Sequence, residues 1–257
     1  MRTIELAGGG RMPVLGLGTW ELGGRACVEV VRRALELGYR HIDTAEMYAN
    51  EGEVGQALAA SGVDRGEVFL TTKVWTSHFR AADAVRAAER SLRLLRTDHV
   101  DLLLMHWPNP DVPLEETLGA FSKLVEAGKA LAVGVSNFSP ELLRRAIDAS
   151  PAPIACDQVR CHVGHAQEPL RSAARAAGVA VTAYWPLRHG GLLGEPLLGE
   201  IGRKHAKTPA QVALKWLIDR EGVAAIPKAS SEEHLKANLD IFDFDLEAGD
   251  RQRLDAL

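Results

Sequence analysis

The chain has 257 residues and a mass of 27.8 kDa, which is long enough to bury a large core. Its 46% hydrophobic and 25% charged residues are typical of a globular protein and exclude a disordered or fibrous one. Lys and Arg total 30 against 34 Asp and Glu, so the formal charge of -4 excludes the basic excess of a nucleic-acid-binding protein.

The cysteines and the apolar runs indicate the cellular compartment of the protein. Cys27, Cys156 and Cys161 are too few and too scattered for a disulfide framework, which favours a reducing compartment. The N-terminus MRTIELAGGG has no apolar core of signal-peptide length, and no run approaches the roughly 20 residues of a membrane span. We therefore expect a cytoplasmic protein with neither a membrane nor a nucleic-acid partner.

In chain order, residues 3–14 predict a hairpin that covers one end of the fold, and strand and helix signals then alternate. Strands are predicted at 15–18, 40–42, 68–73, 100–106, 131–135, 154–159, 179–183 and 223–227. Helices are predicted at 25–37, 51–60, 80–96, 114–127, 139–148, 168–177, 208–220 and 231–239. This alternation predicts an α/β fold over residues 1–257, a single (β/α)8 TIM barrel with an N-terminal β-hairpin and a short C-terminal helix.

Three local signals sharpen these boundaries. Thr208-Pro209-Ala210-Gln211 forms a capping box with Pro at the first helical position, and Ser139-Pro140 starts a helix in the same way. The Gly- and Leu-rich connection from Trp185 to Gly202 is predicted to be a long loop over the pocket. The arginines of the 80–96 helix, Arg86, Arg90 and Arg93, are interpreted as a solvated face.

Four polar residues fall at or just after the ends of successive predicted strands. Asp43 and Tyr48 lie in HIDTAEMYANE (41–51), Lys73 closes VFLTTK, and His106 lies near the end of VDLLLMHW. The C-terminal ends of parallel barrel strands form one rim, where barrel enzymes hold their catalytic groups. We therefore expect these four side chains to meet in one pocket.

Their chemistry suits the protonation of an oxygen. Tyrosine titrates near about 10 unless a cation favours its anion, and Lys73 can supply that charge with Asp43 as counterion. His106 can act as a neutral hydrogen-bond donor to a carbonyl oxygen. Taken singly, they could be a surface lysine, a helix-capping Asp43, a rim tyrosine and a core histidine, but together and in this order they favour an active site for carbonyl reduction.

The chain resembles the aldo-keto reductases over nearly its whole length, in GYRHIDTAEMYANE, TTKVW, LRTDHVDLLLMHWP, GKALAVGVSNFS and TPAQVALKWLI. It is most similar to the prokaryotic 2,5-diketo-D-gluconate and methylglyoxal reductases. The resemblance implies a barrel that binds an extended nicotinamide cofactor without a Rossmann domain. It also implies that Tyr48 donates the proton, that Lys73 and Asp43 tune it, and that His106 orients the substrate.

The resemblance further implies a nicotinamide site. Its residues are Ser136, Asn137 and Gln158 around the carboxamide, Tyr184 as a stacking face, and Pro186 and Leu187 in the loop that follows. Asp157 stands where the family has Asn, and Trp185 stands where a serine is common.

The family's 2′-phosphate site follows the eighth strand. The chain keeps Lys228 and Asn238, but Ala229 replaces a serine and His234 replaces an arginine. Ser230 and Ser231 can bind a phosphate through backbone amides, although Ser230 could simply cap the helix with Glu233. An imidazole carries less charge than a guanidinium at pH 7, so we expect NADPH as the cofactor with NADH as an alternative.

Trp20, Met47, Trp75 and Trp107 follow the first four strands and are expected to line an apolar pocket for a small carbonyl compound. A metal site is suggested by a group of cysteines and histidines, Cys156, Cys161, His162 and His165. One of the cysteines, however, falls on a predicted barrel strand, so we predict no metal.

The expected function is NAD(P)H-dependent reduction of small dicarbonyls and keto sugar acids by a monomer. One alternative is a cofactor-binding redox sensor or regulatory subunit with weak catalysis. Another is a phosphate-substrate isomerase or aldolase in which Lys73 forms a Schiff base.

Overall fold

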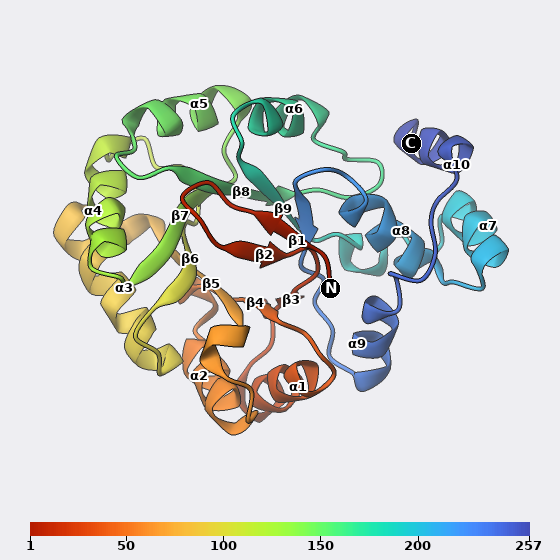
Figure 1. Cartoon of the computed structure of the whole chain (residues 1–257), viewed down its shortest axis with the longest axis horizontal. Coiled ribbons are helices and arrows are strands. Elements are labelled where there is room, and N and C mark those ends of the chain that lie inside the picture. The colour runs from red at the N-terminus through yellow and green to blue at the C-terminus, as the bar shows by residue number, and fades with distance from the viewer.

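The computed structural model describes all 257 residues and contains an eight-stranded parallel sheet curled into a barrel with helices outside it (Figure 1). The strands are β3 (Leu17–Gly18), β4 (His41–Asp43), β5 (Phe69–Val74), β6 (Val100–Met105), β7 (Ala130–Ser136), β8 (Ile154–Arg160), β9 (Ala180–Tyr184) and β10 (Val223–Ala225). They pair in sequence order from β3 to β10. This arrangement confirms the predicted barrel, with each strand within two residues of its expected bounds.

The barrel closes between its first and last strands. Leu15 pairs in parallel with Ala225, and the Gly18 amide donates a hydrogen bond of 3.2 Å to the Pro227 carbonyl. A Cβ atom on Gly18 would lie 2.7 Å from the Ile226 carbonyl oxygen, so only glycine permits this approach. The Gly-rich first strand is therefore a requirement of closure.

The helices form the outer layer. They are α1 (Gly24–Glu36), α2 (Glu51–Ala60), α3 (Ala81–Leu95), α4 (Leu114–Glu126), α5 (Pro140–Ala149), α6 (Glu168–Ala176), α7 (Pro196–His205), α8 (Pro209–Ile218), α9 (Glu232–Leu239) and α10 (Ala248–Asp255). A core cluster of 62 buried residues joins their inner faces to the strands. The capping box at Thr208 and the Ser139 cap are both present, and α10 is the predicted C-terminal helix.

The N-terminal hairpin covers one end of the barrel, as predicted. Strands β1 (Thr3–Glu5) and β2 (Arg11–Pro13) pair antiparallel and lie across the barrel in Figure 1. Leu6 and Met12 are buried in a second apolar cluster with residues of the barrel interior, including Phe69 and Leu104. The hairpin therefore closes the end of the barrel opposite the strands' carboxyl ends.

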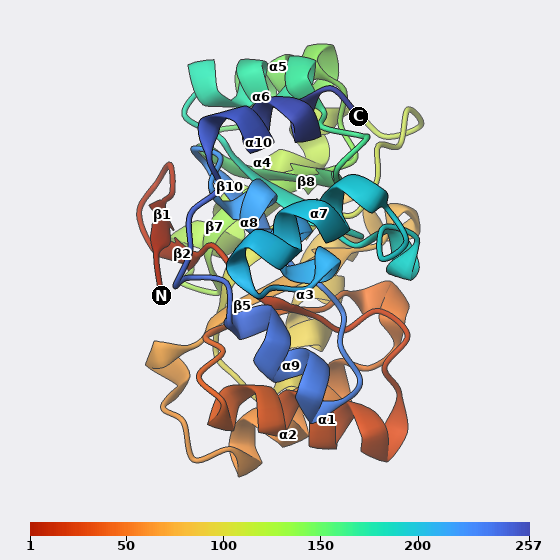
Figure 2. The same cartoon turned by 90° about the vertical axis from the view of Figure 1, so that its right-hand side faces the viewer.

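Two local predictions are wrong. The connection from Trp185 to Gly202 is not one loop, because α7 begins at Pro196 and lies beside α8 and α10 (Figure 2). Gly202 is needed inside this helix, because a Cβ atom at this position would lie only 2.3 Å from the Lys207 carbonyl oxygen. The glycine therefore lets the backbone after the helix pack closely against it. The cap of α9 is Ser231 rather than Ser230, since the Ser231 hydroxyl accepts from the His234 amide.

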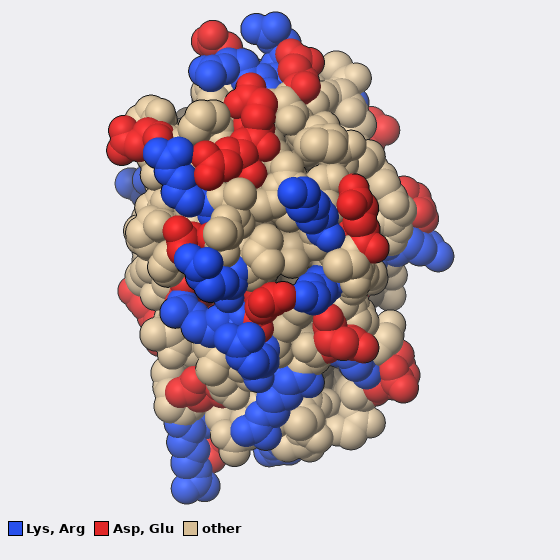
Figure 3. All heavy atoms as spheres, turned by 90° about the vertical axis from the view of Figure 1, so that its left-hand side faces the viewer, with Lys and Arg blue, Asp and Glu red and all other residues tan.

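The face that carries α3 and α4 mixes basic and acidic side chains (Figure 3). Arg86 pairs with Asp83 and Lys129 with Glu89, as expected for a solvated surface. Arg90 differs from that expectation, because it reaches the nearly buried carboxylate of Glu46. Across the whole chain, every helix is too short or too polar to cross a membrane.

Candidate active site

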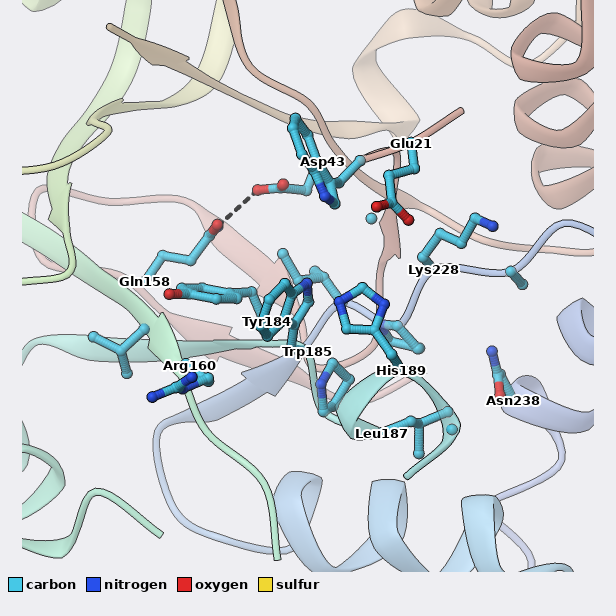
Figure 4. A pocket seen from close by; sticks show the side chains of 18 of the residues that line it. Glu21, Asp43, Gln158, Arg160, Tyr184, Trp185, Leu187, His189, Lys228 and Asn238 are labelled. Carbon is cyan, nitrogen blue, oxygen red and sulfur yellow. Dashed lines mark hydrogen bonds between the residues drawn. The ribbon is translucent and has the colours of Figure 1, made fainter. Parts of the chain in front are cut away.

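A cavity of about 1020 Å³ opens at the carboxyl ends of the barrel strands. Asp43 and Gln158 lie at one end of it, and Lys228 and Asn238 lie at the other (Figure 4). Tyr48 and His106 also line the cavity, beside Asp43 and its partner Lys73. Its size suits a cofactor together with a small substrate.

Lys73 lies at the centre of the Asp43 end, which is the candidate catalytic end. Its ammonium lies 2.6 Å from Asp43 Oδ1, 2.8 Å from the Thr44 carbonyl oxygen and 3.3 Å from Tyr48 Oη. The side chain is 1% exposed, so Lys73 is not a surface lysine. The second oxygen of Asp43 accepts 2.7 Å from Gln158 Nε2, so the carboxylate is bound on both sides and does not cap a helix.

A buried asparagine holds the strand ends that carry these groups. The Asn50 amide donates to the carbonyls of Thr19 and Leu22 at 2.9 and 2.8 Å, and its oxygen accepts 2.7 Å from the Thr44 hydroxyl. Asn50 therefore ties the residues after β3 to those after β4. The sequence motif contains this residue, but nothing in the residue pattern alone indicated its role.

The buried pair sets the charge state of the site. Burial alone would lower the pKa of Lys73, but the Asp43 carboxylate and the Tyr48 phenol favour the ammonium, and the net pKa is raised. Burial also raises the pKa of Tyr48, and the Lys73 charge opposes that rise without cancelling it. Tyr48 therefore retains its proton at neutral pH, whereas the sequence alone emphasised only the opposing effect of Lys73.

His106 completes the catalytic end as a neutral ring. Burial, and then the charge of Lys73, lower its pKa to about 3. Its ring meets Tyr48 edge-on at 5.6 Å between centroids and Trp75 at 5.1 Å. His106 Nδ1 is buried and accepts no hydrogen bond, so it is not a core histidine with satisfied nitrogens, and Nε2 is the nitrogen that can reach a ligand.

The residues expected around the nicotinamide form one hydrogen-bonded group. The Tyr184 hydroxyl donates 2.8 Å to Asn137 Oδ1, and Asn137 Nδ2 donates to the His106 carbonyl and to Ser136 Oγ at 3.1 and 3.0 Å. Ser136 in turn donates 2.7 Å to the Gln158 carbonyl. Asn137 has a φ of 64°, the left-handed conformation that asparagine tolerates better than most residues. Ser136, Asn137, Gln158 and Tyr184 all line the cavity.

Asp157 is the unusual neighbour of this group. Its carboxyl is fully buried, neither oxygen has a hydrogen-bond partner of ordinary geometry, and burial raises its pKa to about 8. The backbone N–H of Phe138 is the group that opposes this rise. Side chains alternate along a strand, so Asp157 points away from the barrel interior into which Gln158 projects.

The other end of the cavity is more exposed. Lys228, Ser230, His234 and Asn238 line it, whereas Ser231 is occupied as the cap of α9 and lies outside the lining. Of these, only Asn238 is buried. Lys228 is the one Lys or Arg at this end, and the carboxylates of Glu21 and Glu233 line the same region.

Apolar side chains form the mouth of the cavity. Trp20, Met47 and Trp107 line it, together with Trp185, Pro186 and Leu187 from the connection after β9. Trp20 packs on Tyr48 with ring centroids 4.9 Å apart. Trp75, expected in the same wall, lies outside the lining and supports His106 instead.

Sequence reasoning missed several polar residues of this cavity, including Arg160, His189 and Glu21. Arg160 lies two positions after Gln158 on β8, so strand alternation could have placed it on the same side. His189 meets Trp185 edge-on with ring centroids 4.2 Å apart, and both residues have positive φ angles that no pattern indicated. Glu21 directly follows Trp20 and also has a positive φ, of 63°.

No group of three or more His, Cys, Asp or Glu side chains lies close enough to bind a metal ion. Cys156 and Cys161 are buried, and burial raises the pKa of both thiols. His162 and His165 pair with each other across a short bridge.

A barrel with a Tyr-Lys-Asp-His group at its rim is the arrangement expected of an oxidoreductase, and sequence comparison identifies the family. Residues 14–257 match the aldo/keto reductase family. The chain therefore belongs to the aldo-keto reductase family, whose members use nicotinamide cofactors.

Several relatives that the chain matches are named as reductases of particular substrates. The chain is 40% identical over 257 residues to a glyoxal reductase of Bacillus subtilis (strain 168), covering 99% of this chain and 92% of the relative. It is 39% identical over 249 residues to the methylglyoxal reductase DkgB of Salmonella typhimurium, covering 96% and 93%. A crystal structure assigned to a 2,5-diketo-D-gluconic acid reductase B superposes with a TM-score of 0.97 at 42% identity, covering 100% of this chain and 91% of the other.

Proposed function

We propose that the protein reduces aldehyde and ketone carbonyls to alcohols with NADPH or NADH, and that Tyr48 donates the proton. The observation that carries the proposal is the phenol of Tyr48 at the cavity wall, 3.3 Å from an ammonium that is itself buried and paired with Asp43. The nicotinamide cofactor, when bound, supplies the hydride that reaches the carbonyl carbon.

The chain's own residues handle the proton. Tyr48 holds its proton until the carbonyl oxygen becomes basic, and it then donates that proton to the oxygen. The Lys73 ammonium stabilises the resulting phenolate, because it already donates toward Tyr48 Oη. Asp43 keeps Lys73 charged and fixed in place.

His106 and the apolar walls position the substrate. A neutral imidazole can donate from Nε2 to a carbonyl oxygen without placing a second cation beside Lys73. Trp20, Met47 and Trp107 exclude water from the reacting carbonyl. The names of the relatives favour small dicarbonyls and keto sugar acids as substrates, and we infer that a monomer suffices because one chain supplies the whole cavity.

The residues present fit a nicotinamide cofactor. Asn137 has a left-handed backbone conformation, and its side-chain amide is fixed by the hydrogen bond from Tyr184. Its polar atoms are therefore oriented before any ligand binds. Ser136 and Gln158 stand beside it, and Lys228 lies at the far end, where a 2′-phosphate would be held. We expect NADPH as the cofactor, with NADH as an alternative, because His234 and Ala229 replace the arginine and the serine that the family has at this site.

The first test compares wild type with Tyr48→Phe, using methylglyoxal and a diketo sugar acid and following NADPH and NADH consumption by absorbance. We expect kcat to fall by about 100-fold or more in the variant, while cofactor binding, read by fluorescence quenching, is retained. Tyr39→Phe is the matched control, because it removes a buried phenol that donates to the Leu235 carbonyl and makes no contact with Lys73.

Other outcomes would point to other functions. A wild-type protein that binds cofactor tightly but reduces neither substrate would favour the sensor interpretation. Borohydride trapping of substrate on Lys73 would favour an aldolase, although the three hydrogen bonds and the burial of that ammonium argue against a Schiff base.

A further inference from the structure

The proposed proton donor is carried by a very short element. Tyr48 ends the single turn η1 (Glu46–Tyr48), which lies between β4 and α2. The turn is closed by backbone bonds from Tyr48 to Ala45 and from Ala49 to Glu46, and Ala49 follows in a left-handed conformation with φ 54°. A turn this short has little stability of its own, so side-chain contacts must set its position.

Glu46 provides those contacts. Its Oε2 accepts a hydrogen bond of 2.9 Å from the backbone amide of Trp75. Its Oε1 accepts from the guanidinium of Arg90 on α3, and His78 Nδ1 lies 2.8 Å from the same oxygen. The Glu46 side chain is only 5% exposed, although the arginine and histidine that face it are partly exposed.

The hydrogen bond from the Trp75 amide to Glu46 joins the segment that carries Lys73 to the turn that carries Tyr48. Trp75 lies two residues after Lys73, directly beyond the end of β5, and Glu46 lies two residues before Tyr48. The same segment carries the Trp75 ring that packs against His106. A shift of η1 away from β5 would therefore change the distance of 3.3 Å between Lys73 Nζ and Tyr48 Oη.

We propose that Glu46 is a positioning residue, which ties the Tyr48 turn to the Lys73 strand and so holds the proton donor at the reacting distance from its cation. The proposal rests on the proposed function. Glu46 touches neither substrate nor the reacting atoms and acts through Tyr48. A carboxylate suits this role because it can accept from the Trp75 amide with one oxygen and from the Arg90 guanidinium with the other.

The test uses Glu46→Ala and Glu46→Gln beside the matched variants Glu116→Ala and Glu116→Gln. Glu116 makes a similar pair of contacts, accepting 2.9 Å from the Ala81 amide and 3.0 Å from Arg80, but it joins the starts of α3 and α4, which carry none of the four proposed catalytic residues. The two Ala variants should lower the melting temperature comparably. Only Glu46→Ala should lower kcat, by about 10-fold or more, with the Kd for NADPH nearly unchanged.

The Gln variants separate position from charge. Glu46→Gln keeps an oxygen for the Trp75 amide, so it should recover most of the kcat that Glu46→Ala loses. Equal kcat losses in the Glu46 and Glu116 series, or a loss expressed only in the cofactor Kd, would overturn the proposal.

A second readout does not require turnover. The titration of the Tyr48 phenol can be isolated as the ultraviolet difference between each protein and its Tyr48→Phe counterpart. Loss of Glu46 should move that phenol away from Lys73 and shift its titration to higher pH, whereas loss of Glu116 should leave it unchanged. If wild type reduces no carbonyl, the proposed function fails, and this titration still decides whether Glu46 positions Tyr48; an unshifted titration would refute it.

Discussion

The two ends of the cavity hold their charges in opposite ways. At the catalytic end, Lys73 and Asp43 are almost completely buried, and each is bound by more than one partner. At the α9 end, Lys228 and His234 are exposed and make no ion pair. At the first end, the proposed proton transfer depends on fixed distances between buried groups. At the second end, the proposed phosphate binding depends mainly on the sign of exposed charges.

This difference has a physical reason. A proton donor must be held within a fraction of an ångström of its target, and a buried ion pair provides that rigidity if all its polar atoms are satisfied. Binding of a phosphate tail tolerates solvent and side-chain motion, because a screened charge acts over several ångströms. Substitutions should therefore cost most at the catalytic end and least near α9.

The largest effect is expected from Lys73→Met. Removing the ammonium leaves the phenolate of Tyr48 without its stabilising charge, so kcat should fall by about 1,000-fold, within the range for loss of acid-base assistance. Steady-state kinetics with methylglyoxal measure this fall. Lys215→Met is the matched control, because Lys215 is also buried and paired, with Asp219 and Asp245, yet lies outside the cavity lining.

Lys73→Met also leaves Asp43 buried without its cation, which destabilises the fold. The double variant Asp43→Asn/Lys73→Met removes both charges and keeps the measurement interpretable if the single variant does not fold. A folded double variant with kcat near that of wild type would contradict the proposed role of Lys73.

A smaller effect, on stability, is expected from Asp157→Asn. The pKa of this carboxyl rises from its ordinary value of 3.8 to about 8 in the fold, so the native state binds a proton that the unfolded chain releases. Stability should therefore fall as pH rises from about 4 through about 8. Asn has no charge to bury, so the variant should be more stable than wild type by about 2 kcal/mol or more at pH 9.

Urea unfolding at pH 5, 7 and 9 measures this difference. Asp219→Asn is a useful contrast, because the nearly buried carboxylate of Asp219 is paired with Lys215 and Arg2, and its loss should destabilise the fold. If wild type and Asp157→Asn show the same pH dependence, the buried carboxyl is not protonated in the fold.

The smallest effect is expected from His234→Arg at the exposed end. The guanidinium would add charge where a 2′-phosphate would lie, so the NADPH to NADH ratio of kcat/KM should rise by about 10-fold with kcat nearly constant. His205→Arg is the control, because His205 lies on α7 outside the cavity lining. An unchanged ratio would place the phosphate elsewhere.

Much of this architecture was predictable from local patterns. Alternating strand and helix signals gave the barrel, since a strand and its covering helix each bury one face and leave a periodic record in the sequence. The meeting of Asp43, Tyr48, Lys73 and His106 was also predictable, because all four fall near strand ends, where a parallel barrel forms its rim. Helix α7 escaped prediction because Gly199 and Gly202 weaken the helical pattern.

The sequence by itself determined the barrel, its hairpin cover and the meeting of Asp43, Tyr48, Lys73 and His106 near one rim, because these depend on periodicity and on positions along strands. Only the tertiary structure decided how the group is held. It showed the support of Tyr48 by Glu46 from a neighbouring segment, the fully buried and unpartnered Asp157, and the placement of Trp75 behind His106. Such features depend on which side chains meet across the barrel, and distances between residues far apart in the chain leave no periodic signal in the sequence.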